Sequence, residues 1–256
     1  IVFILILVFA SVVSDVFLTA RNITNLLRQV SALGIVSFGM LMVILTGGID
    51  LSVGSVMALS SVVFATSIQD HPFIIALAVA CAVCLLAGSV TGFLVSMTGM
   101  APFVASLAMM TVVRGVALIV SNGSPILIDN ASVSYIGQAY ILGIPFPVIM
   151  MIAAFLILFL MLRYTAMGRI IKAIGSNESA VVLTGINVNW HKFTVYAMSG
   201  VLCAIGGIIT TARTSVGSPI ISQGFELDAI DIYEGSIDRI ISPARLRPVV
   251  AELVGT

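Results

Sequence analysis

Charged residues are scarce in this chain, and the groupings on which common catalytic sites depend are absent from it. Aspartate, glutamate, lysine and arginine make up 9% of the 256 residues, whereas soluble domains contain about 25%. Acidic and basic residues number 11 each, and no basic tract occurs, which argues against nucleic acid as a partner. His71 and His191 stand singly at expected loop ends, and no His, Cys or Ser grouping has catalytic spacing. We therefore expect no catalytic residue and no enzyme.

Cysteine is also rare, with only Cys81, Cys84 and Cys203. The first two are spaced C-x-x-C inside an apolar run, and residues three apart share one face of a helix, so a metal or redox site is geometrically possible. Neither a histidine nor a second cysteine pair lies nearby in the sequence. We favour the interpretation that these two cysteines are small buried hydrophobic residues that bind no metal.

Apolar residues fill most of the chain, with 60% hydrophobic residues and a mean hydropathy of +1.22. A helix that crosses a membrane needs about 20 mostly apolar residues. Seven runs approach this length: 1–17, 31–46, 53–68, 73–96, 102–120, 139–162 and 193–212. We predict an all-α, polytopic transmembrane helical bundle. The chain begins at Ile1, and no cleavable signal peptide is visible, so we interpret the first run as the remainder of a spanning helix and expect the N-terminus to be incomplete.

The distribution of lysine and arginine predicts the orientation. The loop 163–192 contains four basic residues, and we assign it to the cytoplasm. Alternation then places 121–138, which has no basic residue, outside. The same count places 18–30 outside although it contains Arg21 and Arg28. We interpret residues 22–29 as an interfacial helix whose arginines reach lipid head groups; the alternative is that one early span is wrongly assigned.

A polar stretch, Thr46-Gly47-Gly48-Ile49-Asp50-Leu51-Ser52-Val53-Gly54-Ser55, separates two of the apolar runs. A carboxylate flanked by membrane-type sequence is costly to place in hydrocarbon, so it faces protein, water or a solute. Glycines destabilise a helix but suit a break whose freed backbone groups line a cavity. We predict broken or re-entrant helices near residues 46–55. The alternative is an ordinary loop at the membrane surface. Four residues of this stretch are candidates for a substrate pathway: Gly47, Gly48, Asp50 and Ser52.

Arg114 is an ionisable group within the predicted span 102–120. Because it lies in the outer half of that span, its side chain could extend to the interface. The functional alternative is that it faces the bundle interior and pairs with a carboxylate or a polar solute. Asp50 is a candidate partner only if the two helices adjoin. We include Arg114 among the pathway candidates.

The basic loop contains the pattern of two short helices joined by a glycine turn. Residues 167–175 form an apolar stripe that ends at Gly175. Ser176 or Asn177 then provides an N-cap, Glu178 an early acidic residue and Gly185 a helix end. A short amphipathic helix on a cytoplasmic surface can dock into a groove on a partner protein. The alternative is a helix lying on the bilayer, which basic residues would favour, but residues 176–190 have none.

The stretch 45–55 resembles the hallmark of the membrane permeases of ribose-type (monosaccharide) ABC importers. Similar agreement occurs at 103–115, 168–188, 199–200 and 225–230, in the same order along the chain. The last of these is Phe225-Glu226-Leu227-Asp228-Ala229-Ile230. Several separated matches are far more specific than any one alone, and together they cover residues 1–230.

The resemblance implies a permease that dimerises, as a homodimer or heterodimer, within the lipid bilayer of the bacterial cytoplasmic (inner) membrane. It implies two further partners, a cytoplasmic ATPase subunit and a periplasmic or extracellular sugar-binding protein. It also implies that residues 168–188 hold the helix that touches the ATPase. The candidate coupling residues in it are Gly168, Arg169, Gly175, Asn177, Glu178, Ser179, Ala180 and Gly185. No phosphate-binding loop occurs in the chain, so we expect no cofactor on it and ATP on the partner subunit.

The resemblance stops at residue 230. Residues 231–256 are polar and contain no apolar run of spanning length. We expect 1–230 to be a transmembrane permease domain that lacks its C-terminal helices, and 231–256 to be an unrelated tail, either frameshifted or a genuine divergence. The leading function is import of a small polar solute, a monosaccharide. The alternatives are an inactive truncated permease and an ion-coupled secondary transporter.

Overall fold

The computed structural model describes residues 2–226, and side chains from residue 8 onward. The predicted tail at 231–256 lies outside the described residues. Four two-residue strands form two antiparallel pairs. The helices are α1 (Val2–Val13), α2 (Ala20–Leu45), α3 (Val53–Asp70), α4 (Phe73–Ser96), α5 (Pro102–Val120), α6 (Ala131–Gln138), α7 (Phe146–Tyr164), α8 (Ala166–Leu183) and α9 (Val188–Thr214). The strands are β1 (Ile126–Leu127), β2 (Tyr140–Ile141), β3 (Ile144–Pro145) and β4 (Val216–Gly217).

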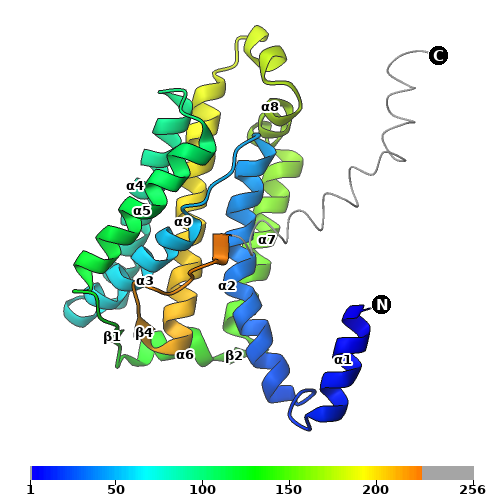
Figure 1. Ribbon diagram of the computed structural model, residues 1–256, viewed down its shortest axis with the longest axis vertical. Coiled ribbons are helices and arrows are strands. Elements are labelled where there is room, and N and C mark those ends of the chain that lie inside the picture. Colours follow the sequence, from blue (N-terminus) through cyan, green and yellow to red (C-terminus); the bar gives the residue numbers. More distant parts are fainter. Residues whose placement is uncertain (1, 227–256) are drawn as a thin grey trace.

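The predicted all-α bundle is confirmed. Within residues 2–226, six helices are long and apolar enough to cross a membrane: α2, α3, α4, α5, α7 and α9. Helix α9 lies at the centre and packs against α2, α3 and α4 (Figure 1). Of the seven predicted spans, the first is represented by α1, whose 12 residues are fewer than a span requires.

Small residues bring the central helices into close contact. A Cβ atom added at Gly200 of α9 would lie 2.4 Å from the backbone oxygen of Cys84 on α4. One added at Gly88 of α4 would lie 2.5 Å from the backbone oxygen of Tyr196. Close backbone approach at small residues is how transmembrane helices gain packing energy without a hydrophobic driving force between them.

The bundle has two distinct ends (Figure 1). Helix α8 covers one end, while α6 and both strand pairs lie at the other. The loop predicted to be cytoplasmic, 163–192, and the loop predicted to be external, 121–138, therefore lie at opposite ends, as the alternation requires. Strand β1 pairs with β4, which follows α9, and this pairing ties the end of α5 to the end of α9.

The prediction of an interfacial helix at 22–29 is wrong, because α2 is a single helix that begins at Ala20. The Thr19 hydroxyl caps it by accepting a hydrogen bond from the Asn22 amide. Arg28 is accommodated within the protein: it donates to the Gln138 carbonyl at 2.8 Å and lies over the Tyr140 ring, 4.7 Å from its centroid. For Arg28, protein contacts thus take the place of the lipid head groups that we had expected.

The predicted span 139–162 also begins too early. Residues 140–145 form a hairpin of β2 and β3, and α7 starts only at Phe146. The two residues at the hairpin turn, Leu142 and Gly143, have positive φ angles of 53° and 79°. This is the backbone of a tight two-residue hairpin turn, which apolar composition alone does not reveal.

Candidate functional site

The predicted break between two spans lies between α2 and α3. Helix α2 ends at Leu45, and the next seven residues, 46–52, are non-helical. Gly47 adopts a φ of +79°, which turns the chain away from the helix axis. The segment then runs back from the end of α2 toward the middle of the bundle, where α3 begins (Figure 1). Because Gly48, Asp50 and Ser52 are buried, the alternative of an ordinary surface loop is excluded.

Asp50 is the only charged residue of this segment, and its side chain faces protein. It is 3% exposed and accepts two hydrogen bonds from Ser52, from the amide at 2.9 Å and from the hydroxyl at 2.6 Å. It lies close enough to Tyr196 and Cys203 of α9 to interact with them electrostatically. No cation pairs with it among the described residues. A buried carboxylate with only two donors from one neighbour is incompletely compensated.

Tyr196 provides a second polar group at this place. Its side chain is 1% exposed, and its hydroxyl has no hydrogen-bond partner among the described residues. A Cβ atom at Gly48 would lie 2.5 Å from that hydroxyl, so the phenol occupies the space that a side chain at residue 48 would need. Gly48, Asp50 and Tyr196 therefore form a buried polar cluster between the broken segment and α9.

Arg114 does not join this cluster. Its guanidinium donates to the carbonyls of Pro219 at 2.8 Å and Ile221 at 3.2 Å, and it interacts electrostatically with Glu226. Arg114 thus faces the segment that follows β4, which favours the interior alternative over extension to the interface. These partners could not be predicted from the sequence, because they lie more than 100 residues from Arg114 and no periodic pattern links them to it.

Helix α8 consists of two helices, as predicted. The break is at Asn177 (φ −159°, ψ 94°), two residues beyond the predicted glycine turn at Gly175. The Asn177 side-chain oxygen accepts a hydrogen bond from the Ala180 amide at 3.0 Å, which is the N-cap geometry expected for the second helix. That helix ends before Gly185, whose φ is +80°. Asn177 is therefore the N-cap, and Ser176 is not.

Glycines hold α8 against the bundle. A Cβ atom at Gly168 would lie 2.5 Å from the Met161 carbonyl oxygen of α7, and one at Gly175 would lie 2.1 Å from the Leu45 carbonyl oxygen. Leu45 is the last residue of α2. The first half of α8 therefore rests directly on the place where the broken segment starts.

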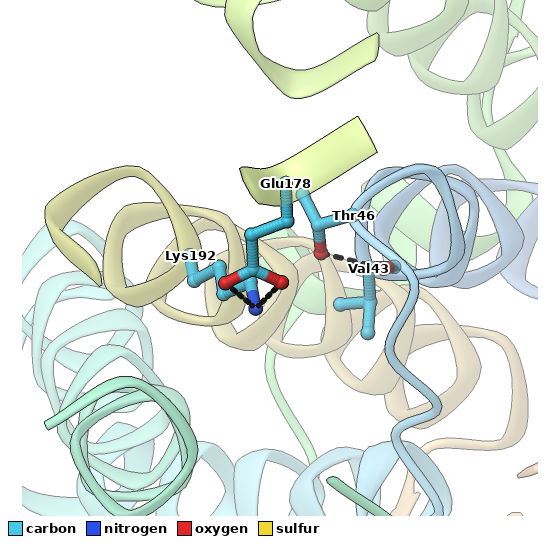
Figure 2. Close-up of polar contacts among 4 residues, drawn as sticks. All are labelled: Val43, Thr46, Glu178 and Lys192. Atoms are coloured by element: carbon cyan, nitrogen blue, oxygen red, sulfur yellow. Dashed lines mark hydrogen bonds and ion pairs between the residues drawn. The ribbon is translucent and has the colours of Figure 1, made fainter. Parts of the chain in front are cut away.

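The second half of α8 is tied to α9 by an ion pair (Figure 2). Both oxygens of Glu178 accept from the Lys192 ammonium at 2.7 Å. Figure 2 also shows the bond from the Thr46 hydroxyl to the Val43 carbonyl, which closes the end of α2. The Glu178 side chain is 48% exposed, so it can also contact a partner protein.

Most of the other candidate coupling residues are exposed. Arg169, Asn177 and Ala180 line a hollow of about 410 Å³ between the two halves of α8. Ser179 and Gly185 are also exposed, whereas Gly168 is buried. The two halves of α8 thus present a concave, mixed polar and apolar surface at this end of the bundle.

A polytopic bundle with a broken helix inside it and a two-part helix across one end has the architecture of a membrane transport protein. The chain belongs to the family described as branched-chain amino acid transport system / permease component, which it matches over residues 22–233. It is therefore a transport permease, not itself an enzyme, and a multi-pass protein of the bacterial cytoplasmic membrane.

Three relatives illustrate the similarity. The ribose import permease protein RbsC of Bacillus subtilis is 43% identical over 232 residues, covering 89% of this chain and 71% of the relative. The ribose import permease of Escherichia coli K12 is 42% identical over 225 residues, covering 86% and 70%. The D-allose transport system permease protein AlsC of the same strain is 34% identical over 229 residues, covering 89% and 70%. No solved structure matches the chain.

Proposed function

We propose that the chain is the transmembrane permease subunit of an ATP-binding-cassette importer that moves a monosaccharide across the cytoplasmic membrane. The observation that carries this proposal is the contact of α8, through Gly175, with the end of α2 where the buried polar segment begins. The relatives support the solute class, because those cited above are named as permeases for ribose and D-allose.

The proposal assigns a partner to each surface. A cytoplasmic ATPase subunit, which binds and hydrolyses ATP, docks on the outer side of α8, and a sugar-binding protein delivers solute at the end formed by α6 and the strand pairs. A second permease chain, identical or different, completes the transporter within the lipid bilayer. The permease itself carries no cofactor and binds no nucleic acid.

The contacts suggest how the ATPase acts on the pathway. A ligand shifts a conformational equilibrium only by its differential affinity for the two states. If nucleotide binding moves the ATPase surface against α8, the close contact of Gly175 with Leu45 transmits that displacement to residues 46–52. The buried cluster of Gly48, Asp50 and Tyr196 then changes its access to the two sides of the membrane.

The proposal is tested by measuring the uptake of radiolabelled D-ribose and D-allose into cells that express the permease with or without its ATPase subunit, while ion gradients are maintained. We expect uptake to collapse without the ATPase. Uptake that persists would show an ion-coupled secondary transporter. No uptake with all partners present would show an inactive permease.

The docking role of Glu178 predicts a specific effect of reversing its charge. Glu178→Lys is expected to reduce co-purification of the ATPase at least several-fold, with normal membrane insertion. The matched control is the double variant Glu178→Lys/Lys192→Glu, which restores the internal ion pair but leaves position 178 positive. We expect the double variant to remain weak. Full recovery of ATPase co-purification in the double variant would show that Glu178 only positions α8. Undiminished co-purification with Glu178→Lys alone would show that Glu178 is not part of the interface.

Adding one methyl group at Gly175 is expected to uncouple ATP hydrolysis from solute uptake. In Gly175→Ala the new Cβ atom collides with the Leu45 carbonyl, so α8 has to move away from α2. We expect ATP hydrolysis by the assembled complex to continue while uptake falls at least tenfold. Ala166→Ser, at an exposed position in the first half of α8 that is not a candidate coupling residue, is the control and should leave both rates unchanged. Equal rates for wild type and Gly175→Ala would contradict transmission through this contact.

A further inference from the structure

A second polar site lies beside the first turn of α3, apart from the cluster around Asp50. It is a cavity of about 520 Å³ between α3, α5 and the segment that follows β4. Cavities that bind small molecules in proteins span about 300–1,000 Å³. Its lining residues come from all three elements, and five of the eight are polar: Ser55, Met110, Thr111, Arg114, Gly115, Leu118, Gln223 and Glu226.

Ser55 is a buried polar group in this lining that lacks a partner. The residue is 0% exposed, and its hydroxyl makes no hydrogen bond to any described residue. Elsewhere in the bundle, Ser37 and Ser96 donate to the carbonyl four residues earlier. Ser55 lies in the first turn of α3, where no preceding helical turn presents such a carbonyl. Its hydroxyl is therefore left for a ligand.

Two opposite charges face the same cavity. One carboxylate oxygen of Glu226 is buried and has no hydrogen-bond partner among the described residues. Arg114 interacts with Glu226 electrostatically, yet within residues 8–226 the two form no ion pair. Both bonds from Arg114 to the carbonyls behind it use Nη1, so Nη2 can donate into the cavity.

The groups in this cavity match a neutral polyhydroxylated solute. A guanidinium offers only donors, a carboxylate only acceptors, and a serine hydroxyl offers both. Sugar hydroxyls donate and accept, so they can bond to all three at once. A free anion would be repelled by Glu226 and a free cation by Arg114.

We propose that this cavity is a sugar-binding site of the permease, in which Ser55, Arg114 and Glu226 bond to hydroxyls of the solute during its passage. The inference rests on the proposed function and deepens it, because it places a stopping point for the solute beside α3. It also gives a role to Glu226, which belongs to the last stretch that resembles the permeases and had no expected role.

The test is equilibrium binding of radiolabelled D-ribose, L-arabinose and D-allose to the complete permease–ATPase complex in lipid nanodiscs, without the sugar-binding protein. For the sugar that binds wild type, we expect Ser55→Ala and Glu226→Gln each to weaken binding at least fivefold. Ser37→Ala, which removes a hydroxyl already bonded to the Leu33 carbonyl, should leave binding unchanged.

A deoxy-sugar series separates a direct contact from a general structural effect. Each monodeoxy analogue of the bound sugar is measured against wild type, Ser55→Ala and Glu226→Gln. For wild type, at least one analogue should bind several-fold more weakly than the parent sugar. For one of the variants, the same analogue and the parent sugar should bind with equal affinity. If every variant loses the same factor for all analogues, the residues act only on structure and the proposal fails.

Sugar uptake is then measured with the same preparation after reconstitution with the sugar-binding protein. This measurement distinguishes an error in the cavity proposal from an error in the proposed function. If wild type imports one of these sugars but shows no saturable binding without the binding protein, the cavity proposal is overturned and the function stands. If wild type imports none of them, both proposals fall.

Discussion

Replacing Gly200 with alanine is expected to destabilise the bundle strongly. The added methyl group would lie 2.4 Å from the backbone oxygen of Cys84, and neither backbone can yield without separating α4 from α9. Overpacking of this kind costs about 1–3 kcal/mol, and more where backbone has to move. We expect the yield of monodisperse protein in detergent to fall severalfold and the remaining protein to unfold at a lower temperature.

Gly115→Ala is the matched control for this substitution. Gly115 is also a glycine within a transmembrane helix, but a Cβ atom there would meet nothing within 4 Å. Because alanine favours a helix over glycine by about 1 kcal/mol, this variant should be as stable as wild type or more so. Equal stability of the two variants would contradict the close approach of α4 and α9.

Replacing Asp50 with asparagine is expected to reduce uptake at least tenfold without loss of folded protein. Asparagine keeps the size of the side chain and an oxygen that accepts from Ser52, but it removes a buried charge that few donors compensate. The neutral side chain is easier to bury, so it favours the conformation described here and opposes the rearrangement that transport requires. We therefore expect thermal stability to be equal or higher while uptake falls.

Ser52→Ala serves as the comparison for Asp50→Asn, since it removes one of the two bonds to the carboxylate but keeps the charge. It should lower uptake less than Asp50→Asn does. Unchanged uptake by Asp50→Asn at normal expression would remove Asp50 from the pathway.

Local sequence features were enough to predict the broken segment and the two-part α8. A helix break needs residues that tolerate positive φ, and Gly47 provides one. A new helix needs a capping side chain, and Asn177 provides one. A carboxylate between two apolar runs is expected to face protein rather than lipid, and Asp50 is indeed buried in the protein. Each of these signals is contained within a few consecutive residues.

The features that could not be predicted depend on contacts between distant segments. Arg28 is stabilised by Gln138 and Tyr140, 110 or more residues away, so its charge alone suggested a membrane surface. The partners of Arg114 follow β4, at the far end of the described chain. Hydropathy and spacing carry no information about which segments fold together, so the cavity beside α3 could be found only in the structure.

The central claim is that the ATPase, acting through α8, controls access to residues 46–52. The most direct test is the rate at which a cysteine at position 49 reacts with a membrane-impermeant maleimide, in a chain whose three native cysteines are replaced by alanine. Ile49 is 42% exposed, so a cysteine there is accessible without unfolding.

The complete complex is reconstituted with the ATPase in nucleotide-free, ATP-bound and ADP-bound states, and the same measurement is made on Gly175→Ala. We predict that the labelling rate at position 49 differs at least fivefold between the ATP-bound and nucleotide-free states, and that Gly175→Ala removes this difference. A rate that is the same in every nucleotide state, in a complex that hydrolyses ATP and imports sugar, would contradict the account.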